Sequence, residues 1–115
     1  MPAERAMALN PLDPGFYHYL LAGAFAHLFG GRPAEALALA QKSVALYPNW
    51  DTTHYVLTVC YIQLGRFAEA RESAARFVSL LPGVTVSRLR QTLRLREPSH
   101  MEMILEGLSK AGLPA

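Results

Sequence analysis

The six residues Gly31-Arg32-Pro33-Ala34-Glu35-Ala36 return 34 positions later as Gly65-Arg66-Phe67-Ala68-Glu69-Ala70. The agreement continues outward at the same spacing in three further pairs: Ala40 and Ala74, Leu46 and Leu80, Pro48 and Pro82. A fixed period of this length, with small residues and prolines in register, indicates stacked helical repeats. We expect the glycine of each copy to close the turn between two antiparallel helices, because glycine adopts a positive φ at little cost.

Composition limits the kind of protein that this chain can be. Its 115 residues, of which 51% are hydrophobic and 17% charged, are enough for one packed domain. The net charge of +2 is too small to indicate nucleic-acid binding by itself. The single Cys60 excludes an internal disulfide and is typical of a reducing compartment. We find neither a secretory leader nor an apolar run of membrane-spanning length, so a cytoplasmic location is predicted.

Apolar spacing predicts two helical hairpins followed by a shorter unit. The first hairpin joins a helix over 16–29 to one that begins at Pro33, and the second joins 51–64 to 67–81. Small residues at facing positions allow the helix axes of each pair to approach closely. The third unit has a helix over about 84–95 and a final amphipathic helix, which we expect to start at Ser99 in a capping box with Glu102.

These helices predict an all-α fold of antiparallel helix-hairpin repeats with a C-terminal capping helix. We expect a single domain over 1–115. Its parts are the end of a preceding repeat at 1–14, one repeat at 15–48, a second at 49–82, and a partial repeat with the capping helix at 83–115. A chain that begins in mid-helix is either a piece of a longer protein or has its start assigned too late, and the sequence leaves this open.

At these residues the chain resembles the tetratricopeptide repeat (TPR), a 34-residue helix–turn–helix unit. The first copy follows its pattern at Leu20, Gly23, Ala24, His27, Ala36, Ala40 and Pro48. The second follows it at His54, Leu57, Thr58, Tyr61, Ala70, Ala74 and Pro82. Both copies lack the Trp and the Phe of the pattern. The resemblance implies an α-solenoid that acts as a protein-binding scaffold.

A narrower resemblance covers most of the chain. It rests on the stretches 9–14, 22–24, 31–32, 85–89 and 106–114. These are similar to the C-terminal repeat region of bacterial multidomain proteins that carry a class III adenylate/guanylate cyclase domain or a winged-helix DNA-binding domain upstream. The resemblance implies a regulatory or scaffolding module of a signalling protein. Neither head domain is represented in this sequence, so no cyclase residues are carried over.

No set of residues in the sequence forms a recognisable catalytic or metal-binding motif. The four histidines lie on different predicted helices without metal-ligand spacing: His18, His27, His54 and His100. Cys60 lies in an apolar helix, and Asp13 and Asp51 stand at positions expected for turns and helix caps. We therefore predict a protein that is not an enzyme, with no cofactor and no metal.

An arginine cluster is the strongest charge feature, and no acidic residue interrupts it between Val84 and Arg96. Arg90 and Arg94 share a helix face and, with Arg88, could bind a carboxylate or phosphate. The alternative is a solvated face whose charges pair with acidic residues further along the chain: Glu97, Glu102 or Glu106. Nucleic acid is disfavoured, because no aromatic residue interleaves with the arginines.

In repeats of this kind the first helix of each pair lines a concave groove. The residues predicted to line it are Leu21, Phe25, Leu28, Phe29, Tyr55, Val59 and Ile62. An apolar groove is costly to leave in water, so a partner segment, a second copy of the chain or the chain's own last helix should fill it. Trp50, beside the turn into the second pair, is interpreted as a residue that packs between repeats.

The leading hypothesis is a non-catalytic protein–protein interaction module. It would bind a partner segment, or a second copy in a homodimer, through the apolar groove. The alternative is a regulatory C-terminal appendage of a multidomain signalling protein, such as an adenylate cyclase or a transcriptional regulator, without a ligand of its own. An upstream catalytic or DNA-binding domain would favour the alternative.

Overall fold

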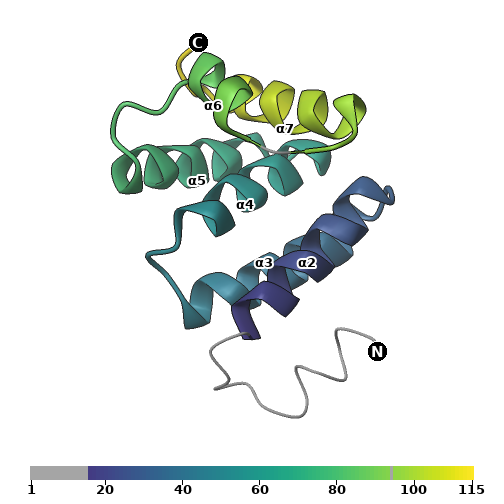
Figure 1. The fold of residues 1–115 in the computed structure, drawn as a ribbon. Coiled ribbons are helices and arrows are strands. Elements are labelled where there is room, and N and C mark those ends of the chain that lie inside the picture. The colour runs from purple at the N-terminus through teal and green to yellow at the C-terminus, as the bar shows by residue number, and fades with distance from the viewer. Residues whose placement is uncertain (1–15, 94) are drawn as a thin grey trace.

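Six helices, arranged as two hairpins and a shorter third unit, make up the part of the chain that the structure describes (Figure 1). This computed structural model describes residues 16–93 and 95–115, so the prediction for 1–14 lies outside it. The helices are α2 (Phe16–Phe29), α3 (Pro33–Leu46), α4 (Asp51–Gln63), α5 (Phe67–Leu80), α6 (Val86–Thr92) and α7 (Pro98–Lys110). The described residues form no strand, and the predicted all-α repeat fold is confirmed.

The two repeat glycines close equivalent turns, as predicted. Gly31 has φ +80 and Gly65 has φ +75, both in the left-handed region. The residue after each glycine donates its backbone N–H to a carbonyl in the last turn of the preceding helix. Arg32 donates to His27 and Arg66 to Tyr61, each over 2.8 Å. This hydrogen bond is the helix C-cap that a glycine in this conformation permits.

Replacing either glycine by alanine should therefore lower the free energy of unfolding by similar amounts. Gly31→Ala and Gly65→Ala are each expected to cost about 1–2 kcal/mol, the cost of a left-handed backbone for a residue with a Cβ. No steric clash adds to this cost, since no atom lies within 4 Å of either added Cβ. Urea unfolding should also show a smaller loss for Gly65→Asn, because asparagine tolerates this conformation better. A negligible loss in both alanine variants would contradict the equivalence.

Buried polar groups join the two hairpins where α3 stacks on α4. The hydroxyls of Ser43 and Thr53 lie 3.1 Å apart with both side chains fully buried. His54, which stands where the repeat pattern has Trp, is also buried, and its Nε2 donates to the carbonyl of Pro48 over 2.7 Å. Trp50 is partly buried and packs against the main core, in agreement with its interpretation as a packing residue. Hydrogen-bonded polar side chains thus replace part of the usual apolar contact between repeats.

The third unit departs from the prediction at both of its helices. Helix α6 spans seven residues instead of about twelve, and it starts after Thr85, whose Oγ1 accepts the N–H of Arg88 over 3.1 Å. The capping box at Ser99 is wrong, because α7 already starts at Pro98 with Glu97 as its N-cap. Proline lacks an N–H and has a fixed φ, so it suits the first helical position. Asp51 likewise is the first residue of α4 and forms no side-chain cap bond.

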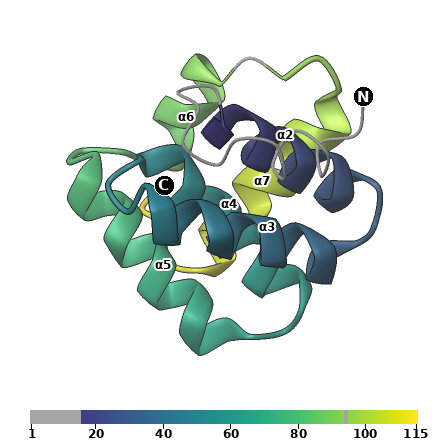
Figure 2. The same cartoon turned by 90° about the horizontal axis from the view of Figure 1, so that it is seen from below.

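Helix α7 turns back across α4, which lies between the first hairpin and α7 in Figure 1, and in the view from below α7 lies behind the nearer helices (Figure 2). After α7 the chain returns to the start of α6. There the carbonyls of Pro114 and Ala115 accept the backbone N–H groups of Val86 and Ser87 over 2.8 and 3.2 Å. These bonds satisfy helix-start donors that have no partner within α6. The third unit therefore closes on itself.

No described helix combines the length and apolarity needed to cross a membrane.

Candidate functional site

Six of the seven residues predicted to line the groove lie in or against one core inside the molecule, and Ile62 lies apart from them. Leu21, Leu28, Tyr55 and Val59 are buried in the main core, and Phe25 and Phe29 pack against it partly buried. Ile62 is buried in a separate small cluster with Ala70, Ala74 and Ala111. The concave face formed by α2 and α4 is therefore covered in this structure.

Helix α7 is the element that covers it. Its apolar stripe, Ile104, Leu105 and Leu108, is buried in the same core as Tyr55 and Val59. The two helices cross closely at Gly107, where an added Cβ would lie 3.2 and 3.3 Å from the methyl groups of Val59. Even an alanine there would require Val59 to shift by a few tenths of an ångström, so the crossing favours a residue no larger than alanine. Of the three occupants that the sequence leaves open, the chain's own last helix fills the concave face here.

An aromatic row runs through this site and links four helices. The ring centroids of Phe25 lie 5.6 Å from Phe29 and 6.2 Å from Tyr55, and Tyr55 lies 5.6 Å from Phe77 of α5. At the other end, Phe29 stacks on His100 of α7 with 3.9 Å between centroids and parallel planes. Burial, with a smaller effect of the Asp51 charge, raises the pKa of Tyr55 to about 12. The row is therefore uncharged at Tyr55 and behaves as apolar surface.

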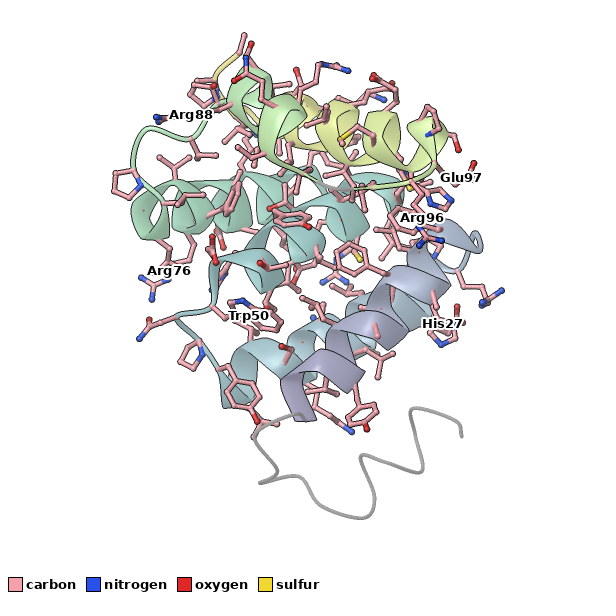
Figure 3. All side chains as sticks on the ribbon, viewed as in Figure 1. His27, Trp50, Arg76, Arg88, Arg96 and Glu97 are labelled. Atoms are coloured by element: carbon pink, nitrogen blue, oxygen red, sulfur yellow. The ribbon has the colours of Figure 1, made fainter. Side chains whose placement is uncertain are left out.

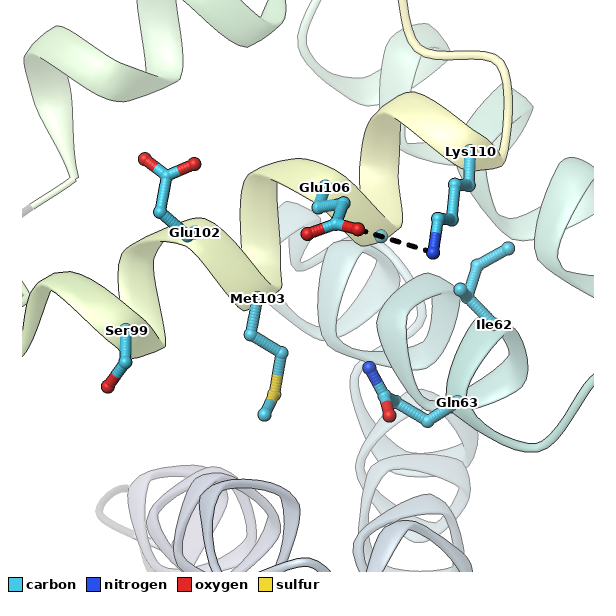
Figure 4. A pocket seen from close by; sticks show the side chains of 8 residues that line it. Ile62, Gln63, Ser99, Glu102, Met103, Glu106 and Lys110 are labelled. Atoms are coloured by element: carbon cyan, nitrogen blue, oxygen red, sulfur yellow. Dashed lines mark ion pairs between the residues drawn. The ribbon is translucent and has the colours of Figure 1, made fainter.

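A cleft of about 370 Å³ lies open beside this site, between α7 and the C-terminal end of α4 (Figure 4). Its lining residues are Ile62, Gln63, Ser99, Glu102, Met103, Glu106, Gly107 and Lys110. Glu106 pairs with Lys110 over 3.3 Å on its exposed edge. The cleft could not be inferred from spacing along the chain, because it results from the angle at which α7 crosses α4.

A comparison with family models agrees with this architecture. Residues 30–78 match the model described as tetratricopeptide repeat. The match supports a tetratricopeptide repeat protein. It covers the turn at Gly31, the helices α3 and α4, and most of α5, which together carry both copies of the repeated sequence. Such repeats are non-catalytic and generally mediate protein–protein interaction. No curated protein matches the chain, so the narrower resemblance to cyclase-associated and winged-helix regulators stays a prediction.

The arginines beyond the TPR segment are not gathered into one anion site among the residues that the structure describes. Nη1 of Arg90 lies 2.5 Å from Oε1 of Glu102, and this hydrogen bond lowers the pKa of the Glu102 carboxyl. That pairing is the one that the solvated-face alternative expects. Arg88 instead donates to the carbonyl of Gly83 over 3.3 Å. Arg94 lies outside the described residues.

The prediction that the chain holds no metal site can be compared with the described residues 16–93 and 95–115. The described His, Cys, Asp and Glu residues include no group of three placed to hold a metal ion. Two histidines take part in local contacts instead: His27 accepts a hydrogen bond from Nε of Arg32 over 2.9 Å, and His54 donates to Pro48. Each of these interactions fixes a turn next to a helix.

Cys60 should be unreactive while the helical-repeat fold is intact. Its side chain is fully buried, and burial raises the pKa of the thiol from 9.0 to about 12, so the reactive thiolate is scarce at neutral pH. We expect an aromatic disulfide reagent to label Cys60 at least about a hundredfold more slowly in the folded protein than in urea. Equal labelling rates in the two states would contradict the burial of the thiol.

The folded state holds the Cys60 proton more tightly than the unfolded state. The free energy of unfolding should therefore fall as the pH rises from about 9 towards about 12.

Proposed function

We propose that this chain is a non-catalytic protein-interaction module whose concave face receives one amphipathic helix. The observation that carries the proposal is α7 itself, seated on α4 with its apolar stripe buried. The face is aliphatic and aromatic, so affinity for a helix comes from apolar burial and not from charge.

The way α7 fits predicts the kind of helix that a partner would present. It carries large apolar residues at 101, 104, 105 and 108, which is one face of a helix. Between them stands Gly107, at the point of closest approach to Val59. A competing helix therefore needs a similar apolar stripe with glycine or alanine at the crossing. The helix α7 of a second copy meets this requirement, and so does any helix of another protein that carries this stripe and a small residue at the crossing.

Partner binding of this kind requires that α7 leave the face. The Arg90–Glu102 ion pair between α6 and α7 is exposed on both sides and adds little to the docking of α7, and the Glu106–Lys110 pair lies within α7. Residues 95–97, which directly precede α7, are not helical. The docked state is thus held mainly by apolar contacts, which another helix can replace one for one.

The test uses the full chain and a fluorescent peptide with the sequence of residues 98–113. Gly107→Leu introduces a side chain against Val59, where overpacking costs about 1–3 kcal/mol. If the substitution weakens the docking of α7 by about 1.4 kcal/mol, the population of molecules in which α7 has left the face increases about tenfold. We therefore expect the peptide to bind this variant about tenfold more tightly than the wild-type chain, measured by fluorescence anisotropy.

Two controls separate this effect from general unfolding. Ser109→Leu alters an exposed residue of the same helix and should leave the affinity for the peptide unchanged. A peptide with aspartate at the position of Leu105 should not bind either variant. If the Gly107→Leu variant keeps its helical circular dichroism and still fails to bind the peptide more tightly, the concave face is not a helix receptor.

A further inference from the structure

A second apolar pocket, remote from the concave face, lies where α5 passes into α6. Its volume is about 330 Å³, which is within the range of ligand pockets. The lining residues are Leu81, Pro82, Val84, Arg88, Leu89 and Thr92. All but Arg88 and Thr92 are apolar, and the cleft between α4 and α7 shares none of them.

The pocket exists because α6 does not continue the repeat stacking. At the junction of the two repeats α4 packs along α3, but the seven-residue α6 lies mainly against α7 and leaves the end of α5 largely uncovered. Leu81, at that end, remains 39% exposed. Pro82 beside it is also exposed, so apolar surface lies open at the point where a further repeat helix would otherwise pack.

The walls of the pocket are held in place by hydrogen bonds. Gly83 has φ +84, and the N–H of Val84 donates to the carbonyl of Leu81 over 3.2 Å, which forms a tight turn below the pocket. On the other wall, the first turn of α6 is fixed by Thr85 and by the returning C-terminal residues 114–115. Because the pocket is already formed, a ligand need not order these segments when it binds.

The electrostatic surroundings indicate which ligand fits. Between Glu72 and Glu97 the sequence contains no acidic residue and five arginines: Arg76, Arg88, Arg90, Arg94 and Arg96. Arg88 lies at the rim, on the outer edge beside the α5–α6 connection (Figure 3). Among the described residues its guanidinium meets only a carbonyl oxygen, at 3.3 Å, whereas Arg90 has a carboxylate partner. A carboxylate next to an inserted apolar group would pair with Arg88.

We propose that this pocket binds a short acidic segment of another protein. One large aliphatic or aromatic side chain of the segment inserts between Leu81 and Leu89, and an adjacent carboxylate pairs with Arg88. A second copy of this chain fits less well. Phe67 is the most exposed aromatic residue among the side chains that the structure describes, and the acid nearest to it along the sequence, Glu69, is already paired with Arg66. Nucleic acid is disfavoured, since the pocket offers no aromatic ring for base stacking.

The probe is a fluorescein-labelled nonapeptide with a central Phe flanked by Glu residues, titrated into the full chain. We expect Arg88→Glu and Leu81→Gln each to raise the Kd at least tenfold. Arg71→Glu, which makes the same charge change at an exposed position of α5 outside the pocket, should change it less than twofold. Matched peptides with Ala for Phe, or Lys for Glu, should bind at least tenfold more weakly. Backbone amide shifts should move within 81–92, and an excess of the unlabelled 98–113 peptide should not displace the probe.

Four results would overturn the proposal. The first is no binding of the probe up to millimolar concentration, and the second is equal weakening by Arg88→Glu and Arg71→Glu, which would indicate unspecific attraction. The third is a set of shift changes centred on the cleft beside Glu106. The fourth is a concentration-dependent increase in mass that Leu81→Gln abolishes, because a second copy would then be the occupant. Both pocket variants alter exposed side chains, so circular dichroism should show them folded.

Discussion

Phe77→Ala is expected to lower the free energy of unfolding by about 3–5 kcal/mol, the range for removing a fully buried aromatic side chain. Phe77 is 1% exposed and its ring packs 5.6 Å from that of Tyr55, at the junction of α4 and α5. The change removes the ring from the middle of the main core and leaves a cavity beside Tyr55. Urea denaturation followed by circular dichroism measures the loss.

The matched control lies on the same helix. Phe67 is 50% exposed, so Phe67→Ala should change the free energy of unfolding by less than about 1 kcal/mol. Two identical substitutions ten residues apart in the sequence are thus expected to differ by several kcal/mol. Similar losses in the two variants would contradict the position of α5 against α4.

Ile104→Asp should have an effect of similar size through α7. Ile104 is fully buried, so the new carboxylate would lie in the core without a partner, which costs about 3–5 kcal/mol when the charge is not compensated. Because a domain of this size is stable by about 5–15 kcal/mol, we expect α7 to leave the concave face in this variant. Hydrogen exchange of the amides in 101–110 should lose its protection, and urea unfolding should report the lost stability.

Ser109→Asp is the control for that substitution, since Ser109 is exposed on the same helix. Its effect on stability should stay within about 0.5 kcal/mol. Unchanged exchange protection of α7 in Ile104→Asp would show that the helix is not held by its buried stripe.

The repeated part of the chain could be predicted closely from the sequence. The expected helix over 16–29 has the observed bounds, and the ends expected at 64 and 81 each lie one residue beyond those of α4 and α5. This agreement has a physical cause: Gly31, Gly65 and the prolines at the repeat ends act within a few residues of the positions that they determine. In the third unit no glycine or proline stands between Gly83 and Pro98 to mark where α6 ends, and the length of α6 was overestimated there.

Long-range contacts could not be predicted in the same way. Phe77 and His100 belong to the aromatic row, yet neither carries a local pattern that assigns it to the concave face. Their roles depend on where α7 lies, and an amphipathic helix can cap an array end or fold back over its face with the same sequence. The pocket at the α5–α6 junction was missed for a related reason, because it depends on the shortness of α6.

The return of α7 across both hairpins bears on how this chain unfolds. In an open solenoid each repeat touches only its neighbours, and so terminal repeats can melt independently. Here α7 contacts α2 through His100 and Phe29 and approaches α4 at Val59. Ala111, the residue that follows α7, joins the small cluster that contains Ala74 of α5. Melting of either hairpin would break contacts with α7 and so weaken the other. The helices α2–α7 should therefore melt in one cooperative transition, with equal calorimetric and van't Hoff enthalpies.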